Sequence, residues 1–433
     1  MLSSRPLHVT SLLLLGLAAC IPGRSLGRTA AVAEVKHVGF RDDIPDAARG
    51  NAVFEDAVWS RDGSLFVTLH HMQTALRVWN GGDGSLLSRV ETSPLEEGWI
   101  VDGPSRRMIG RKHPAPGLVV YDLMTGQPLD SIFEDSAQRS RVLGLTDEGT
   151  ALVRAVPGAI EVWQLHPALL RRSLPSPLPA ESYPPSCVGG IFATYNTKRC
   201  WEVSPRGNWL GLAFTPEPRT TSASQFLLVN LNDGRSRDLT PAANAQGQGQ
   251  HLASFAFSAD ERHLAIGLTN GIQLYDITED RAGPFLPGAH QRNALLGAMG
   301  FSADGTRLVA LGDQLQVSTF EVATGRLLGR HEPEFWDWEG IFRLSDDGSR
   351  VVIYHFVSDL LEVLDGADVH RVGWVCPVFC NTKHNPVPVA FAVSPDGRRV
   401  VASHRYGAGI YQLDTDRPLQ SLMDPTMPAV HPR

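Results

Sequence analysis

The chain has 433 residues, a formal net charge of −7 at pH 7 and a charged fraction of 20%. Nucleic-acid binding needs a concentrated basic footprint, so this charge balance argues against a nucleic-acid partner. The 41 glycines are typical of a chain with many tight turns. Such a chain can exceed the usual length of one domain if it is built from repeats.

Residues 1–19 have the form of a signal peptide, because the apolar run Leu12–Ala19 is too short to span a bilayer. The run ends in Leu17-Ala18-Ala19-Cys20, which resembles the lipobox of bacterial lipoproteins. That resemblance implies that Cys20 is diacylated and becomes the mature N-terminus. Ile21 stands where an aspartate would retain a lipoprotein in the inner membrane, so the resemblance also implies the outer membrane. An ordinary signal peptide followed by an accidental cysteine is the alternative.

Residues 20–49 are expected to form a lipid-anchored tether. Within them, Ala31–Val38 alternates weakly between apolar and polar residues. This segment is predicted to add a strand to the last unit of the fold, because closing a ring removes free sheet edges.

One unit then recurs from residue 50 to 422. It consists of a strand, a turn rich in serine, aspartate and glycine, a second strand and a third strand that ends near an aromatic residue. Phe301–Ala310 and Val393–Ala402 are its clearest copies, and Ile160–Trp163 shows the third strand. In such turns aspartate caps backbone amides and glycine accepts a positive φ.

Eight copies of the turn can be placed. They begin at Ser60, Asp102, Thr146, Ser204, Ser258, Ser302, Ser345 and Ser394. The turn glycines Gly305, Gly348 and Gly397 lie 43 and 49 residues apart, which is the length of a four-stranded propeller blade. The sequence therefore predicts an all-β chain forming a single β-propeller of eight four-stranded blades, with residues 423–433 as a tail. A seven-bladed ring, with the degenerate unit at Asp102 absorbed as an insertion, is the alternative.

The turns resemble those of the WD-repeat-like propellers of bacteria, the type with Ser-Pro-Asp-Gly turns, over residues 50–422. The eukaryotic WD pattern is not kept, because Trp79-Asn80 and Trp163-Gln164 stand where Trp-Asp would be expected. The hydrogen-bond relay of that family therefore cannot be transferred to this chain. The overall plan is also similar to that of the eight-bladed propeller lipoprotein of the outer-membrane barrel-assembly machinery.

Four further cysteines are predicted to form disulfides, because an exported chain meets an oxidising compartment. Three pairings are possible. Cys187 with Cys200 would staple the long insertion Ser176–Arg199, and Cys376 with Cys380 would close a small loop between the last two blades. A four-cysteine metal site is the alternative, although the spacing lacks two Cys-x₂-Cys knuckles.

One group of histidines belongs to the enzyme alternative. His70 with His71, His355 and His404 each follow the second strand of a unit, and their repeated position is the only constellation in the sequence that could support an enzyme, as a ring of ligands or proton carriers at one end of the propeller. Adjacent residues on a strand point to opposite faces, so His70 and His71 make a poor chelate. The sequence contains no Cys-x-x-Cys-His haem motif.

The segment Glu332–Glu339 combines four acids with Phe335, Trp336 and Trp338. Aromatic side chains mixed with charge are frequent at interface hot spots, so these three are interaction candidates. Packing between neighbouring blades is the alternative use for them.

These features predict a binding protein rather than an enzyme. We expect an envelope-anchored interaction or scaffolding module without a cofactor or a resident metal. Its partner would be an unidentified envelope protein or cell-wall ligand, captured by loops that escape the repeat: Ser176–Arg199, Pro216–Ser224 and Trp374–Pro388. The alternative is an exported propeller enzyme or redox subunit, resembling the quinoprotein amine-dehydrogenase heavy chains, with its site at one mouth of the channel.

Overall fold

The computed structural model describes the chain in ordered stretches separated by gaps. These are residues 30–39, 54–60, 62–70, 75–91, 100–102, 106–111, 117–133, 141–146, 150–177, 201–214, 225–240, 252–268, 271–287, 299–312, 316–333, 340–355, 360–375, 391–404 and 407–418. The elements formed by these residues are all β-strands. Within this part of the chain, no helix has the length and apolar character needed to cross a membrane.

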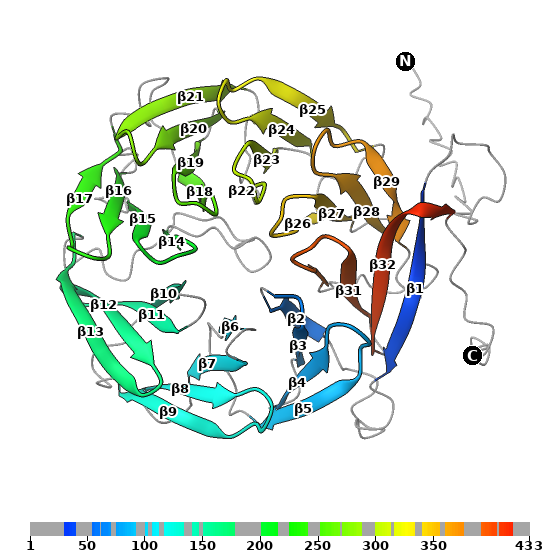
Figure 1. Cartoon of the computed structure of the whole chain (residues 1–433), viewed down its shortest axis with the longest axis horizontal. Helices are drawn as coiled ribbons and strands as arrows, with labels where there is room; N and C mark the ends of the chain where they lie inside the picture. The colour runs from blue at the N-terminus through cyan, green and yellow to red at the C-terminus, as the bar shows by residue number, and fades with distance from the viewer. Residues whose placement is uncertain are drawn as a thin grey trace, which may run out of the picture.

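The strands form eight four-stranded antiparallel sheets, arranged as the blades of a closed ring (Figure 1). This confirms the predicted propeller of eight blades over the seven-bladed alternative. The first blade consists of β2(Phe54–Trp59), β3(Leu65–His70), β4(Ala75–Asn80) and β5(Leu86–Glu91), and the second of β6(Ile100–Asp102), β7(Arg107–Arg111), β8(Gly117–Asp122) and β9(Pro128–Phe133). The third consists of β10(Arg141–Thr146), β11(Ala151–Val156), β12(Ala159–Leu165) and β13(Ala168–Pro175), and the fourth of β14(Trp201–Val203), β15(Trp209–Phe214), β16(Gln225–Asn230) and β17(Ser236–Asp238).

The remaining blades follow the same order. They are β18(Leu252–Phe257), β19(His263–Leu268), β20(Gly271–Asp276) and β21(Arg281–Pro287); β22(Met299–Phe301), β23(Arg307–Leu311), β24(Val317–Glu321) and β25(Leu327–His331); β26(Gly340–Leu344), β27(Arg350–His355), β28(Leu360–Asp365) and β29(Arg371–Val375); and β30(Phe391–Val393), β31(Arg399–His404) and β32(Gly407–Pro418), completed by β1(Ala30–Gly39). The degenerate unit near Asp102 forms the second blade, β6 to β9.

The eighth blade joins both ends of the described chain. Its strand order is β1-β32-β31-β30, so the N-terminal strand is its outermost strand. β1 runs antiparallel to β32, with Ala30 opposite Pro418 and Gly39 opposite Gly407. At the junction with the first blade, Trp59 Nε1 donates a hydrogen bond to the carbonyl oxygen of Ala392 over 3.0 Å. The ring is therefore closed by strand pairing within the eighth blade and by contacts with the first.

Local turn chemistry explains the repeated unit. In the first blade the Ser60 hydroxyl donates to Asp62 Oδ1 at 2.6 Å and accepts the amide of Leu65 at 3.0 Å, while Gly63 has a φ of +68°. The same serine-to-aspartate bond recurs at Ser258, Ser302, Ser345 and Ser394, with lengths of 2.5 to 2.6 Å. These turns fix the register between the first and second strands of each blade.

The hydrophobic core is distributed between the blades. Between the fifth and sixth blades, for example, Ile272 and Leu274 pack with Leu308 and Phe320. Between the sixth and seventh, Val309 and Val317 pack in the same way with Ile353 and Leu364.

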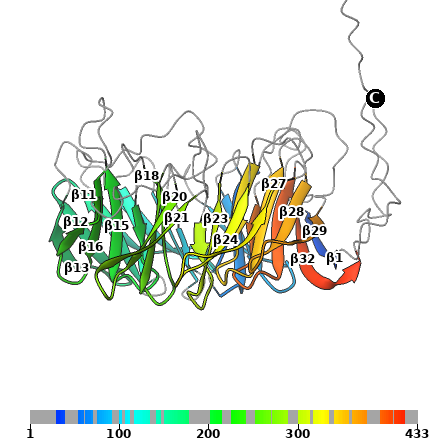
Figure 2. The ribbon, with the colours of Figure 1, turned by 90° about the horizontal axis from the view of Figure 1, so that it is seen from above.

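The ring has two faces. Because the strands alternate in direction, each first strand ends and each second strand begins at one face, and the same holds for each third strand and its fourth. This face is here called the turn face (the lower side in Figure 2). The opposite face, here called the loop face, holds the ends of the second and fourth strands. The strand ends that flank residues 178–200, 215–224 and 376–390 therefore all lie at the loop face.

Candidate functional site

Three of the predicted histidines occupy one structural position. In the first blade Leu65 pairs with Asn80, in the seventh Arg350 with Asp365 and in the eighth Arg399 with Gln412. His70, His355 and His404 each lie five residues beyond that starting pair, at the loop-face end of the second strand. The seventh, eighth and first blades are neighbours in the ring, so the repeat does bring these backbone positions to one sector of the loop face (Figure 1). His71 lies outside the described residues.

The side chain of His355 does not contribute to a ring at the channel mouth. It is fully buried, and its Nε2 lies 3.0 Å from Glu362 Oε2 on the neighbouring strand β28. Its imidazole also packs at 5.5 Å from the ring of Trp374. His355 is therefore not part of such a ring, because the strand turns this side chain into the interface with the sixth blade, where its partner Glu362 meets His331.

Glu362 is the centre of this buried cluster. Its side chain is 0% exposed, although it interrupts the otherwise apolar run of β28. Its Oε1 lies 3.0 Å from Nε2 of His331, which is contributed by the sixth blade, and 3.3 Å from Nε of Arg371. The carboxylate therefore connects two blades through His331 and two strands of its own blade through His355 and Arg371.

The surroundings keep Glu362 ionised. Burial alone would raise the pKa of this carboxyl, but the contacts with His331 and His355 outweigh it and lower the pKa to about 2. The guanidinium of Arg371 contacts Oε1 of Glu362, the same carboxylate oxygen that His331 contacts. A buried carboxylate paired in this way stabilises one arrangement of the two blades, because removing a partner would leave a charge without compensation.

Two imidazoles and a carboxylate are also ligand types that transition metals accept. Among the described residues, however, only Asp365, Asp368 and His370 place three such donor atoms within 4.8 Å of one another. The donor atoms of the Glu362 cluster therefore do not converge on one point. The cluster fits an interblade contact better than a metal centre.

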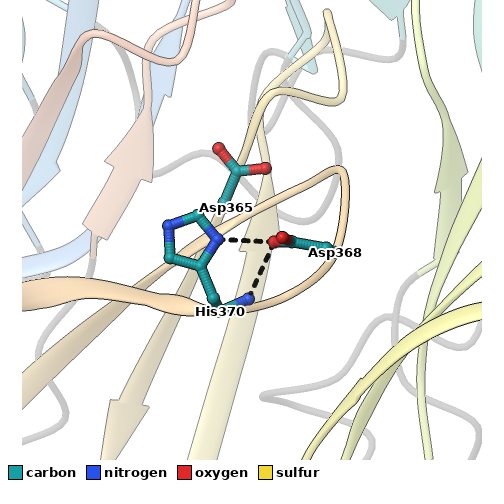
Figure 3. Close-up of side chains that lie close together, drawn as sticks. All are labelled: Asp365, Asp368 and His370. Carbon is teal, nitrogen blue, oxygen red and sulfur yellow. Dashed lines mark hydrogen bonds and ion pairs between the residues drawn. The ribbon is translucent and has the colours of Figure 1, made fainter.

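The Asp365, Asp368 and His370 group lies at the exposed turn between β28 and β29 (Figure 3). Asp365 accepts the amide of Ala367 at 2.7 Å and contacts Arg350 Nη1 at 2.9 Å. Asp368 accepts the amide of His370 at 3.1 Å and contacts its Nδ1 at 2.5 Å. The carboxylates therefore already serve the turn.

The equivalent turns of other blades show the same pattern. In the first blade Asn80 accepts the amide of Gly82 and Asp83 accepts the amide of Ser85; in the second, Asp122 accepts the amide of Met124 and Thr125 the amide of Gln127. Side-chain oxygens at these positions form the turns in several blades, whether they belong to an acid, an asparagine or a threonine. Their proximity in the seventh blade needs no metal to explain it.

The other sequence candidates cannot be placed. Cys20, the cysteines at 187, 200, 376 and 380, and Phe335, Trp336 and Trp338 all lie outside the described residues. What sequence analysis missed is Glu362 with His331 and Arg371. The signal available was one acid inside an apolar strand, Leu360–Leu364, but its partners lie in other strands and no local motif connects them.

Comparison with known proteins identifies the fold and nothing narrower. No family model and no curated protein matches the chain. Among solved structures, the C-terminal WD40 domain of Sif2 aligns with a TM-score of 0.59 at 8% identity, covering 89% of this chain and 99% of that domain. The computationally designed Ika8 protein aligns with a TM-score of 0.55 at 14% identity, covering 89% of this chain and 100% of that one. Hsv2 from Kluyveromyces lactis aligns with a TM-score of 0.50 at 11% identity, covering 73% and 94%. The protein is thus a β-propeller with a WD40-like fold.

Proposed function

We propose that this protein is a non-catalytic interaction propeller of the bacterial cell envelope, anchored by a lipid at Cys20. Its loop face captures an envelope protein or a cell-wall ligand. The observation that carries the proposal is where the strands flanking the long segments outside the repeat begin and end. The strands that flank the two cysteine-bearing segments, 178–200 and 376–390, end at one face of a rigid ring.

Recognition on such a frame follows from how the repeat is constrained. The blade strands are fixed by packing between neighbours, whereas loops can vary without affecting that packing. A loop closed by a disulfide would lose less conformational entropy when it meets a partner. A Cys187–Cys200 bridge would therefore favour binding by the segment that contains it, with the aromatic segment Phe335–Trp338 as a second contact.

The polar clusters that the structure describes support a binding role over a catalytic one. Glu362 and its histidines connect blades, and Asp365 and Asp368 stabilise a turn. The side chains in these two clusters stabilise blade contacts and a turn, and they do not surround a space in which a substrate could bind.

The position of β1 is compatible with the anchor. Because β1 is antiparallel to β32, Ala30 lies at the turn face, where β32 ends at Pro418. If Cys20 carries the lipid, the short linker 21–29 connects the membrane to β1, and the chain enters the ring at the turn face, opposite the loop face. The loop face would then be free to meet a partner.

The deciding experiment removes the candidate loop. Residues 180–199 are deleted, and proteins bound to the anchored chain are cross-linked in cells and identified by mass spectrometry. We expect a folded, membrane-bound propeller that has lost its principal cross-linked partner. Arg235→Glu, at a side chain 88% exposed on the turn face, is the matched control and should retain that partner.

Two results would contradict the proposal. One is a deletion variant that retains every cross-linked protein, and the other is a turnover or a tightly bound metal that disappears when His70 and His404 are changed to alanine. The anchor is tested separately with Cys20→Ser. That variant should leave the membrane fraction or remain unprocessed, whatever the loop deletion does.

A further inference from the structure

The Glu362 cluster lies between the ends of two outer strands. His331, which contacts Glu362 Oε1 at 3.0 Å, is the last residue of β25 in the sixth blade. In the seventh blade Glu362 pairs with Trp374 in the ladder between β28 and β29, one pair before β29 ends at Val375. Both outer strands end at the loop face, in neighbouring blades (Figure 1). One buried carboxylate therefore stands where the chain leaves two adjacent blades.

The end of β29 is held by side chains that Glu362 itself contacts. Arg371 Nε lies 3.3 Å from Glu362 Oε1, and the guanidinium carbon of Arg371 lies 5.3 Å from the centre of the Trp374 ring. The ring of His355 lies 5.5 Å from that of Trp374, and its Nε2 lies 3.0 Å from Glu362 Oε2. Trp374 is thus placed by two residues that the carboxylate holds. The position at which the chain leaves β29 therefore depends on Glu362.

The segments that follow these two strands are both interaction candidates. The aromatic and acidic residues 332–339 follow β25, and the cysteine-bearing residues 376–390 follow β29. The third blade, which precedes the other cysteine-bearing segment, 178–200, lies on the opposite side of the ring (Figure 1). The cluster thus connects two candidates of one sector and leaves out the third.

We propose that Glu362 is a positioning residue that fixes the ends of β25 and β29 relative to each other, so that the two following segments bind the same partner. The inference rests on the loop-face function proposed above and names the sector that performs it. Two contacts held at a fixed spacing lose less entropy when one partner engages both. Removing one partner of a buried carboxylate leaves its charge less compensated, so a change in either blade should affect the other.

Glu161 in the third blade provides an internal comparison. It occupies in β12 the ladder position that Glu362 occupies in β28. Its carboxylate also contacts an arginine and a tryptophan, Arg154 and Trp163, each at 2.7 Å. Neither partner lies on an outer strand, because Arg154 belongs to β11 and Trp163 to β12. Changing Glu161 therefore removes a similar cluster without releasing the end of an outer strand.

Hydrogen exchange on the full-length chain measures the coupling between the two strand ends. Amide exchange is followed in β25 and β29, with β5 of the first blade as the reference for global opening. We expect His331→Leu, a change in the sixth blade, to speed exchange in β29 of the seventh by about tenfold relative to that reference. Arg371→Leu should have the same effect on β25. A role confined to one blade would not produce either cross-effect.

Two matched variants separate the positioning role from a general loss of stability. His331→Gln keeps a hydrogen-bond donor for Glu362, so exchange in β29 should stay within about twofold of the natural chain. Glu161→Gln should likewise leave β25 and β29 within about twofold.

The shared partner is tested in cells with the photo-reactive residue benzoylphenylalanine, placed at Glu334 in one variant and at Val378 in another. We expect both positions to cross-link to the same protein. His331→Leu should lower both cross-linking yields together, by about fivefold, because the two contacts lose their fixed spacing. Glu161→Gln should leave both yields unchanged.

Three outcomes overturn the proposal. Exchange in β29 that His331→Leu does not alter removes the positioning role, whatever the cross-links show. Cross-links from the two positions to different proteins remove the shared partner. Absence of any cross-linked protein at both positions removes this sector from the binding site. The loop-face function as a whole is judged separately, by the deletion of residues 180–199, so the two failures remain distinct.

Discussion

At the scale of single residues, the most informative positions are those that depart from the repeat. Glu261 occupies the position of the turn glycine and adopts a φ of +61°, a backbone region that costs a non-glycine residue about 1 kcal/mol or more. Its nearly buried carboxylate accepts the amide of Arg206 at 2.7 Å and Asn208 Nδ2 at 2.6 Å, both in the fourth blade. The strain is therefore offset by two bonds between blades.

This balance predicts that restoring the repeat will harm the protein. Glu261→Gly relieves the backbone but removes two hydrogen bonds to a charged acceptor, each contributing about 1.5–3 kcal/mol. We expect a net loss of about 2 kcal/mol in the free energy of unfolding, measured by denaturant titration. Glu261→Gln, which keeps one acceptor oxygen, should be intermediate. A glycine variant as stable as the natural chain would show that the bonds contribute little.

Glu362 predicts a pH dependence with a definite sign. Its pKa is lowered from 4.5 in the unfolded chain to about 2, so its stabilisation is complete above 4.5 and is lost as the pH falls toward 2. At 1.36 kcal/mol per pKa unit, the contribution is about 3 kcal/mol at neutral pH. Glu362→Gln should therefore be clearly less stable than the natural chain at pH 7, and the difference should shrink by pH 2.5. Urea midpoints at several pH values provide the measurement, and a difference that stays constant with pH would refute the charge-based explanation.

Sequence reasoning at this scale succeeds where the chemistry is local. The bond from Ser60 to Asp62 could be predicted, because a serine, an aspartate and a glycine within four residues define the turn that they form. The contacts of Glu261 with Arg206 and of Glu362 with His331 could not, because those partners lie in neighbouring blades and depend on how adjacent sheets face each other. The contact of His355 with Glu362 was missed because it joins two strands of one blade without a local motif.

At the scale of elements, β1 is the strand on which closure of the eighth blade depends. Without it, β32 would become an outer strand with a long unpaired edge from Gly407 to Pro418. Such edges recruit other strands and promote aggregation.

Deleting residues 30–39 should therefore lower the thermal midpoint, speed hydrogen exchange in β32 and cause aggregation on heating. Deleting residues 23–27 instead shortens the linker but leaves β1 paired, so that variant should exchange in β32 as the natural chain does. If the two deletions behave alike, the pairing of β1 does not hold the eighth blade.

The number of blades could be predicted from the sequence because each blade brings its own turn signal, even the degenerate one at Asp102. The strand registers could not. Bulges such as the one opposite Val162 and Trp163 shift the pairing by one residue without any glycine or proline to mark them.

At the scale of the whole molecule, the two faces of the ring differ in the chain segments that lie at them. The turn face holds short, hydrogen-bonded turns and the start of β1, and the loop face holds the ends of strands that flank the long excursions. An anchored chain would use this difference to set its orientation. The linker 21–29 spans at most about 30 Å when fully extended, so Ala30 and the adjoining turn face would be held near the bilayer.

The orientation can be tested by inserting the same protease site either between residues 189 and 190 or within the turn at Asp233–Gly234. In the membrane-anchored protein we expect the loop-face site to be cut much faster than the turn-face site, because the bilayer shields the turn face. The ratio of the two cleavage rates is measured again after detergent solubilisation, which removes the membrane. This second ratio corrects for the intrinsic difference in cleavage between the two sites. A ratio that does not change on solubilisation would mean that the membrane does not orient the ring, and the loop face would then have no preferred exposure to partners.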